Sequence, residues 1–316
     1  MSEQSRPKVT FLTVDEYAAG QRLDNFLLKT FKGVPKTRIY KALRKGEIRV
    51  NKGRCKADYR LNVGDSLRLP PLRQSDPTER RPIPRFWMEL LPELTVYEDD
   101  GLLVINKPAG LAVHGGSGLN FGLIECLREL RSKDKYLELV HRLDRDTSGL
   151  IMVARKPAVL RELHEQLRED RVDKRYLALA VGQWPRSRRV VEAPLVKNTL
   201  QSGERMVRVS AEGKRSITEF SVMERFQRAT LVEAKPVTGR THQIRVHAQY
   251  AGHPLLGDSK YSDPAGEQLA RELGLKRLFL HARSLQFTLP TIGTVSLEAE
   301  VDNELESILN KLRNLL

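Results

Sequence analysis

The feature that most limits the fold of this chain is a proline-rich stretch near the end of its first quarter. Residues 70–92, PPLRQSDPTERRPIPRFWMELLP, contain six prolines and few apolar residues before Phe86. Proline fixes φ and has no backbone N–H, so this stretch is typical of an extended tether with little core of its own. The sequence therefore predicts two domains, residues 1–85, with the linker from about residue 70, and residues 86–316.

Positive charge is concentrated in the first of these domains. The chain of 316 residues carries a formal net charge of +14. Residues 1–85 contain 20 lysines and arginines against 9 aspartates and glutamates, a net charge of +11, which leaves +3 for all the residues that follow. Such a field attracts polyanions, and lysine and arginine commonly neutralise phosphates. The first domain is therefore a candidate for nucleic-acid binding.

Other classes of protein are disfavoured by what the sequence lacks. No apolar run approaches the roughly 18 to 20 residues of a membrane-spanning helix, and the first residues have no apolar stretch long enough for a secretory signal. The chain has two cysteines, Cys55 and Cys126, and no metal-ligand spacing such as HExxH or CxxC. We therefore expect a cytoplasmic protein without a membrane anchor, a metal or a disulfide framework.

The first domain begins with two helical patterns. Residues 20–31 place apolar side chains at helical spacing. A second helix is predicted over 37–46, with Ile39 and Leu43 directed inward and the basic residues outward. Gly46 is expected to end this helix.

Short strands joined by glycine turns at residues 51–53 and 63–65 follow these helices. The order RLD, two helices, G-x-I-x-V-N and V-G-D resembles the S4-like RNA-binding domain over residues 20–70. In that family the second helix and the following turn face RNA. The resemblance assigns RNA binding to Arg22, Arg38, Lys41, Arg44 and Lys45. From charge alone, a solvated basic helix face is an equally good interpretation.

The sequence after the linker alternates between strand and helix patterns without an internal repeat. Strands are expected at residues 102–106, 136–143, 149–156, 175–183, 216–226 and 228–239. Helices are expected over 157–170 and 242–252, and two strands and a helix should end the chain. This order favours an α+β fold, in which a largely antiparallel mixed sheet with flanking helices follows the small α/β S4-like domain.

The segment HRLDRDTSGL, residues 141–150, places Asp144 between two arginines, Arg142 and Arg145, directly before an apolar run. Taken alone, an aspartate between arginines is usually a solvated turn, because structural ion pairs outnumber catalytic ones. Two further motifs change this interpretation. Tyr176 in KRYLALAVG follows 32 residues after Asp144, and TGRTHQIRVHAQYAGHPLLGD spans residues 238–258. Together the three motifs resemble the RluA-type pseudouridine synthases over about residues 20–290.

The resemblance implies an isomerase that converts specific uridines in 23S ribosomal RNA to pseudouridine without a cofactor. It implies one essential carboxylate, Asp144, which adds to the uracil ring or to the ribose carbon, or removes a proton from the sugar. Arg245 would pair with this aspartate and keep it ionised, and Tyr176 would stack on the flipped base. Its partner would be 23S ribosomal RNA or a large-subunit assembly intermediate, and we expect a monomer.

Several residues of the second domain have two interpretations. Arg142 and Arg145 are expected to contact the RNA backbone, and Lys107 is either a phosphate contact or a surface lysine. Leu280 is either the apolar floor beneath the base or part of the core. Tyr176 could be a core strand tyrosine, and His242 and His247 are expected to be structural. The glycine-rich residues 115–118 lack the lysine of a phosphate loop and are expected to form a flexible turn.

Two other functions compete with the isomerase. One is a non-catalytic RNA-binding or ribosome-assembly factor, and the other is a synthase that acts on transfer RNA. Binding alone does not require Asp144, Tyr176 and Arg245 together, which disfavours the first competitor. The S4-like domain favours ribosomal RNA over transfer RNA only moderately.

Overall fold

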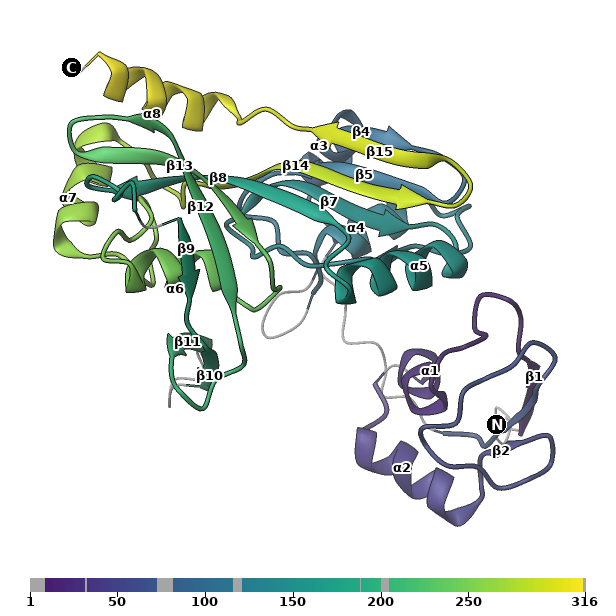
Figure 1. The fold of residues 1–316 in the computed structure, drawn as a ribbon. Helices are drawn as coiled ribbons and strands as arrows, with labels where there is room; N and C mark the ends of the chain where they lie inside the picture. Colours follow the sequence, from purple (N-terminus) through teal and green to yellow (C-terminus); the bar gives the residue numbers. More distant parts are fainter. Residues whose placement is uncertain are drawn as a thin grey trace, which may run out of the picture. The chain divides into compact units, whose positions relative to one another are not determined.

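The chain forms two compact units, Met1–Pro82 and Ile83–Leu316 (Figure 1). The computed structural model describes residues 9–31, 33–72, 82–115, 121–187, 189–199 and 205–314. The division lies three residues before the domain boundary expected from the sequence. Among the described residues, no helix is long and apolar enough to cross a membrane.

The first unit consists of two helices packed against a small sheet. Its elements are β1 (Thr10–Thr13), α1 (Leu23–Thr30), α2 (Lys36–Lys45), β2 (Arg49–Val50) and β3 (Ser66–Leu69). The strands pair antiparallel in the order β1-β3-β2. Leu27 of α1, Ile39 of α2 and Leu67 of β3 are fully buried in one cluster. Gly46 ends α2 with φ 70°, a left-handed conformation that glycine adopts without strain, so the predicted helix end is confirmed.

The last part of the expected linker is a helix. α3 (Arg85–Glu93) begins after Pro84, and the extended tether predicted through residue 92 is therefore wrong for these residues. The helix forms because Trp87, Met88 and Leu91 share a face that packs on the core of the second unit. Residues 73–81 of the expected linker lie outside the described residues.

The second unit is built on a ten-stranded sheet, so the predicted α+β class with a mostly antiparallel mixed sheet is confirmed. The main strand order is β4-β5-β7-β14-β8-β13-β12-β9, and β15 pairs with β14 and β6 with β7. Its strands are β4 (Thr95–Glu98), β5 (Leu102–Lys107), β6 (Glu138–Leu139), β7 (Ser148–Ala154), β8 (Asp173–Val181), β9 (Val190–Glu192), β12 (Ile217–Arg225), β13 (Ala229–Pro236), β14 (Leu280–Leu289) and β15 (Gly293–Glu298). The pairing of β7 with β14 is parallel, and the others are antiparallel.

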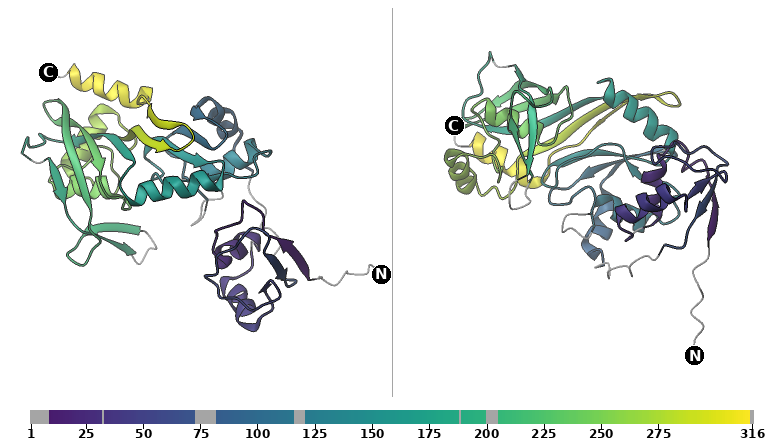
Figure 2. Two further views of the ribbon diagram at one scale, coloured as in Figure 1. Left: turned by 45° about the vertical axis from the view of Figure 1, so that its right-hand side comes forward. Right: turned by 90° about the horizontal axis from the view of Figure 1, so that it is seen from below.

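Five helices and a separate hairpin complete this unit. The helices are α4 (Leu123–Leu130), α5 (Pro157–Arg168), α6 (Gln243–Tyr250), α7 (Pro264–Leu273) and α8 (Asn303–Arg313). The hairpin consists of β10 (Leu195–Thr199) and β11 (Arg205–Val209), and it projects away from the large sheet (Figures 1 and 2). The patterns in the sequence predict α5, α6 and α8 but not α4 or α7. Of the residues expected to form a glycine-rich turn, 116–118 lie outside the described residues.

A close contact between β7 and β14 fixes where the HRLDRDTSGL loop ends. Gly149 has φ 109°, and a Cβ on it would lie 2.3 Å from the carbonyl oxygen of Ala282. Only glycine fits this position, because both the conformation and the space exclude a side chain. Ala282 pairs with Gly149 on one side and with Tyr176 of β8 on the other. The register of these three strands therefore brings the loop and Tyr176 to the same part of the sheet.

Candidate active site

Hydrogen bonds hold the loop that carries Asp144 to the turn after β5 and to β7, the strand that follows the loop. The backbone N–H of Gly110 donates to the carbonyl of Arg145 at 2.9 Å, and the N–H of Met152 donates to Nε2 of His141 at 3.2 Å. Within the loop, the N–H of Thr147 donates to the carbonyl of Asp144 at 3.2 Å. The side chain of Asp144 is 26% exposed, so a rigid backbone presents a carboxylate that an external molecule can reach.

Lys107 is a further anchor of this loop, which contradicts both interpretations made from the sequence. It is fully buried, and its Nζ donates to the carbonyls of Pro108, Leu111 and Arg145 at 2.8, 2.9 and 3.2 Å. A buried amine with these partners is neither a surface lysine nor a phosphate contact. Burial lowers the pKa of Lys107 to about 7, against the opposing effect of nearby carboxylates.

Arg245 lies on α6 and connects Asp144 with a second carboxylate, Asp258. Its Nε and Nη2 donate to the two oxygens of Asp258, both at 2.7 Å, whereas its Nη1 lies 3.4 Å from Oδ2 of Asp144. The guanidinium carbon is also 5.0 Å from the ring centre of Tyr261. The structure thus brings Arg245 and Asp144 together as expected. The stronger, bidentate contact of Arg245 is with Asp258.

Asp258 is the principal residue of the site for which the sequence motifs predict no role. It is 1% exposed, and Oδ1 also accepts the backbone N–H groups of Lys260 and Tyr261 at 2.9 and 3.1 Å. A turn at Gly257 places it, since φ is 74° and a Cβ there would lie 1.9 Å from a carbonyl oxygen. One signal was available: an arginine on the apolar face of a helix requires a buried carboxylate, and an aspartate ends the GHPLLGD motif.

His242 faces Asp144 from the start of α6 and is held by Tyr261. Nδ1 of His242 lies 2.8 Å from the Tyr261 hydroxyl, which accepts the N–H of Val207 at 3.0 Å. The phenol can donate its own proton to Nδ1 while it accepts this N–H, since a hydroxyl both donates and accepts. In that tautomer the imidazole proton is on Nε2, which lies 3.7 Å from Oδ2 of Asp144. Burial lowers the pKa of His242, which favours this neutral form.

Tyr176 is close enough to Asp144 to feel its charge, and it packs against two core clusters without being fully buried. Burial and the negative charge of Asp144 raise the pKa of Tyr176 well above its ordinary value. Its phenol is therefore protonated near neutral pH.

The remaining sequence-predicted residues of this unit are divided between surface and core. Arg142 is exposed, and Arg145 is 58% exposed and pairs with Asp146 at 2.9 Å. Leu280 is 4% exposed and packs with Ala178 in a core cluster.

His247 is buried, and its ring nitrogens lie 2.9 Å from Oγ1 of Thr218 and 3.0 Å from the carbonyl oxygen of Ala193. This is the arrangement expected for a structural histidine. No cluster of three or more potential metal ligands occurs in the part of the chain that the structure describes.

The five basic residues singled out in the first unit differ in their contacts. Arg22 pairs with the buried Asp24 at 2.8 Å, and Arg38 pairs with Glu47 at 2.8 Å. The hydrogen bond from Arg22 contributes most to lowering the pKa of Asp24 to about 2. The other three residues, Lys41, Arg44 and Lys45, are exposed on α2.

The motifs and the fold agree with a known family. The RNA pseudouridylate synthase family matches residues 101–250, and the S4 domain matches residues 21–67. A solved structure, human RNA pseudouridylate synthase domain containing 4, superimposes with a TM-score of 0.61 at 30% identity, covering 72% of this chain and 96% of that one. The chain belongs to the RNA pseudouridylate synthase family, whose members are isomerases that act on RNA.

Curated relatives match almost the whole chain. Ribosomal large subunit pseudouridine synthase C of Pasteurella multocida is 56% identical over 308 residues, which cover 96% of this chain and 94% of that protein. The protein of the same name in Escherichia coli K12 is 55% identical over 317 residues, which cover 99% of both chains.

Proposed function

We propose that this pseudouridine synthase converts specific uridines in 23S ribosomal RNA, with Asp144 as its catalytic carboxylate. The observation that carries the proposal is the convergence of Asp144, Arg245 and Tyr176 at one part of the sheet. The likeness to large-subunit synthases from end to end supports the substrate class. Those relatives also favour ribosomal RNA over transfer RNA.

The reaction breaks the bond between ribose and N1 of uracil, rotates the base, joins C5 to the ribose and releases the C5 proton. Asp144 supplies an ionised carboxylate that attacks the substrate or removes a proton from the sugar. Arg245 supplies a positive charge 3.4 Å from that carboxylate. His242 supplies an N–H directed at the same oxygen. Both groups orient the carboxylate of Asp144 from the side of α6.

Tyr176 binds the base in this proposal. The target uridine must leave its helix, at a cost of a few kcal/mol, and stacking on an aromatic ring returns about 1 to 3 kcal/mol. The raised pKa of Tyr176 keeps the phenol neutral. A neutral ring beside Asp144 holds the detached uracil without placing a second negative charge against the carboxylate.

The first unit contributes RNA affinity through exposed cations, among them Lys41, Arg44 and Lys45 on α2. The enzyme acts as a monomer in the cytoplasm and needs no cofactor, because the reaction is redox-neutral and transfers no external group. Arg142 and Arg145 contact the RNA backbone near the target.

Mapping of pseudouridines in 23S ribosomal RNA, from cells with and without the gene, tests the substrate. We expect defined positions to lose the modification when the gene is deleted and to regain it when the gene is restored. Loss confined to transfer RNA would contradict the proposed substrate. An unchanged map would contradict the proposed function.

A further inference from the structure

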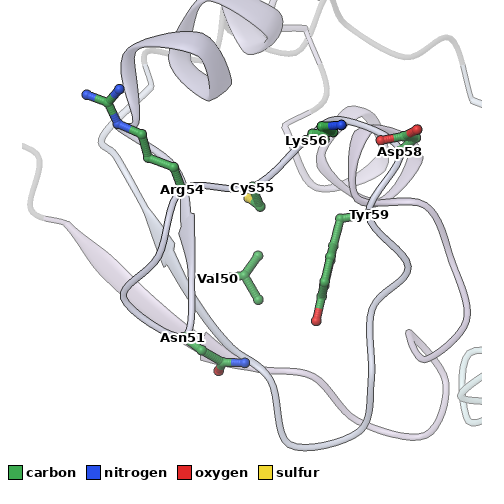
Figure 3. Close-up of a pocket in the computed structure, with 7 residues that line it drawn as sticks. All are labelled: Val50, Asn51, Arg54, Cys55, Lys56, Asp58 and Tyr59. Atoms are coloured by element: carbon green, nitrogen blue, oxygen red, sulfur yellow. The ribbon is translucent and has the colours of Figure 1, made fainter.

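The first unit contains a hollow that the proposed reaction does not use. Its volume is about 350 Å³, at the small end of the range of roughly 300 to 1,000 Å³ for ligand pockets. The loop between β2 and β3 forms most of it (Figure 3). The lining residues are Val50, Asn51, Arg54, Cys55, Lys56, Asp58 and Tyr59.

One buried carboxylate holds two walls of this hollow in place. Asp65 accepts the Tyr59 hydroxyl at 3.0 Å and the side-chain amide of Asn51 at 2.7 Å. The carbonyl of Tyr59 also accepts the backbone N–H of Leu23 at the start of α1, at 2.8 Å. The ring of Tyr59 is therefore held in place in the free protein. Because the site is preformed, binding costs little conformational entropy.

The walls combine an aromatic ring, apolar side chains, two cations and one carboxylate, that of Asp58. Figure 3 shows Tyr59 edge-on, with Val50 and Cys55 facing it across the hollow. Lys56 stands at the rim, and Arg54 extends away from the hollow along the end of α2, where its Nε would lie 2.8 Å from a Cβ on Gly46. Both cations are exposed and form no ion pair within the described residues. Unpaired bases of RNA are commonly held by aromatic stacking, with cations on the neighbouring phosphates.

We propose that this hollow binds one unpaired nucleotide of the substrate RNA, with its base stacked on Tyr59 and its phosphates beside Lys56 and Arg54. The side chain of Arg54 lies against Gly46 at the end of α2, next to the exposed Arg44 and Lys45. The RNA backbone therefore continues over that helix. The site gives the first unit a means to distinguish bulged or looped RNA from a regular duplex. This inference rests on the proposed function only in that the first unit contacts RNA.

The test uses the full chain and two RNA hairpins without uridine, which the catalytic site cannot modify. One hairpin is fully paired, and the other carries a single unpaired adenosine. Fluorescence anisotropy measures both affinities for the wild type and for Tyr59→Leu, Tyr59→Phe and Lys52→Gln. Stacking on an aromatic ring changes affinity by about 5- to 150-fold. We expect the wild type to prefer the bulged hairpin by at least about fivefold.

The variants separate stacking from general charge. Tyr59→Leu should abolish the preference, and Tyr59→Phe should retain it because the ring remains. Lys52 is exposed beside the hollow but does not line it, so Lys52→Gln should weaken both complexes equally. A wild type without preference, or a folded Tyr59→Leu protein that retains it, would overturn the proposal.

A second measurement needs no variant. Cys55 lines the hollow and is half-buried, whereas Cys126 is buried and serves as an internal reference. Saturating bulged hairpin should slow alkylation of Cys55 by iodoacetamide, and saturating paired hairpin should not. Equal protection by both hairpins, or by neither, would overturn the site. Neither experiment requires turnover, so a failure of the proposed reaction on 23S ribosomal RNA would be seen separately.

Discussion

The two units use positive charge in different ways. On α2 of the first unit, Lys41, Arg44 and Lys45 are exposed and make no ion pair among the described residues. In the second unit, Lys107 and Arg245 are 0% and 4% exposed, and protein carbonyls or carboxylates surround them. Cations of the first kind are available to phosphates and are screened by salt, whereas those of the second kind hold Asp144 and its loop in place and are screened much less.

Removal of the charge on Asp144 should have the largest effect. Asp144→Asn keeps the shape of the side chain, so we expect the protein to fold and to bind RNA with little change. Turnover should disappear because every version of the reaction requires the carboxylate. The assay is release of tritium from C5 of uridine in 23S ribosomal RNA. A rate within about tenfold of the wild type would exclude a catalytic role.

The partner of the buried arginine should be next in importance. Asp258→Asn leaves Arg245 without its closest charge partner, and breaking a buried ion pair typically destabilises by about 3 to 5 kcal/mol. The exposed pair of Arg228 and Glu272 offers the control, since Glu272→Gln should change stability by about 0 to 1 kcal/mol. Urea unfolding measures the free energy of unfolding of both variants. Equal losses of stability would show that the buried ion pair of Arg245 contributes no more than an exposed pair.

Lys107 should make stability depend on pH in a specific window. Its folded pKa of about 7 lies below the ordinary value of 10.5, so the unfolded chain binds more protons between these values. The free energy of unfolding should therefore rise with pH in this window, by up to about 1.4 kcal/mol per pH unit from this group. Lys107→Met should remove that contribution, and Lys41→Met on the exposed helix should not. If the free energy of unfolding depended on pH in the same way in the wild type and both variants, burial would not lower the pKa of Lys107 as proposed.

The hydrogen-bonded chain through Tyr261 should have the smallest effect. Tyr261→Phe removes the hydroxyl that holds Nδ1 of His242 and thereby orients its ring toward Asp144. We expect kcat to fall by about three- to tenfold with KM unchanged, because the change affects orientation more than binding. The double variant with His242→Ala should be no worse than His242→Ala alone. Additive losses would show that the two residues act independently.

The local motifs predict the residues to which we assign direct roles in the reaction, but not the residues that support them. Asp144, Tyr176 and Arg245 lie in recognisable segments, and the strand register brings them together. Lys107 contacts the carbonyl of Arg145, 38 residues away, and Asp258 contacts Arg245, 13 residues away; only the fold creates these contacts.

Specific physical reasons also explain why three elements, α3, β1 and α7, are not predicted from the sequence. Prolines at both ends masked α3, whose apolar face becomes meaningful only against the core of the second unit. The strand β1 is short and largely exposed. Its side chains do not alternate between buried and exposed, so its sequence lacks the alternation of apolar and polar residues that predicts a strand. α7 does carry local signals, an Asp263 cap, Pro264 in its first turn and Gly274 at its end, and these would have located it.

The central claim is that the first unit supplies RNA affinity and the second unit supplies the reaction. The most direct test is the salt dependence of RNA binding by a protein that lacks residues 1–82. This protein keeps Ile83, which packs on the core of the second unit. Each lost phosphate contact should lower the slope of log affinity against log salt by about 0.7 to 0.9. We predict weaker binding with a slope reduced by several such steps, and unchanged conversion of uridine in a short RNA at saturating concentration. Binding with the slope of the full chain would contradict the account.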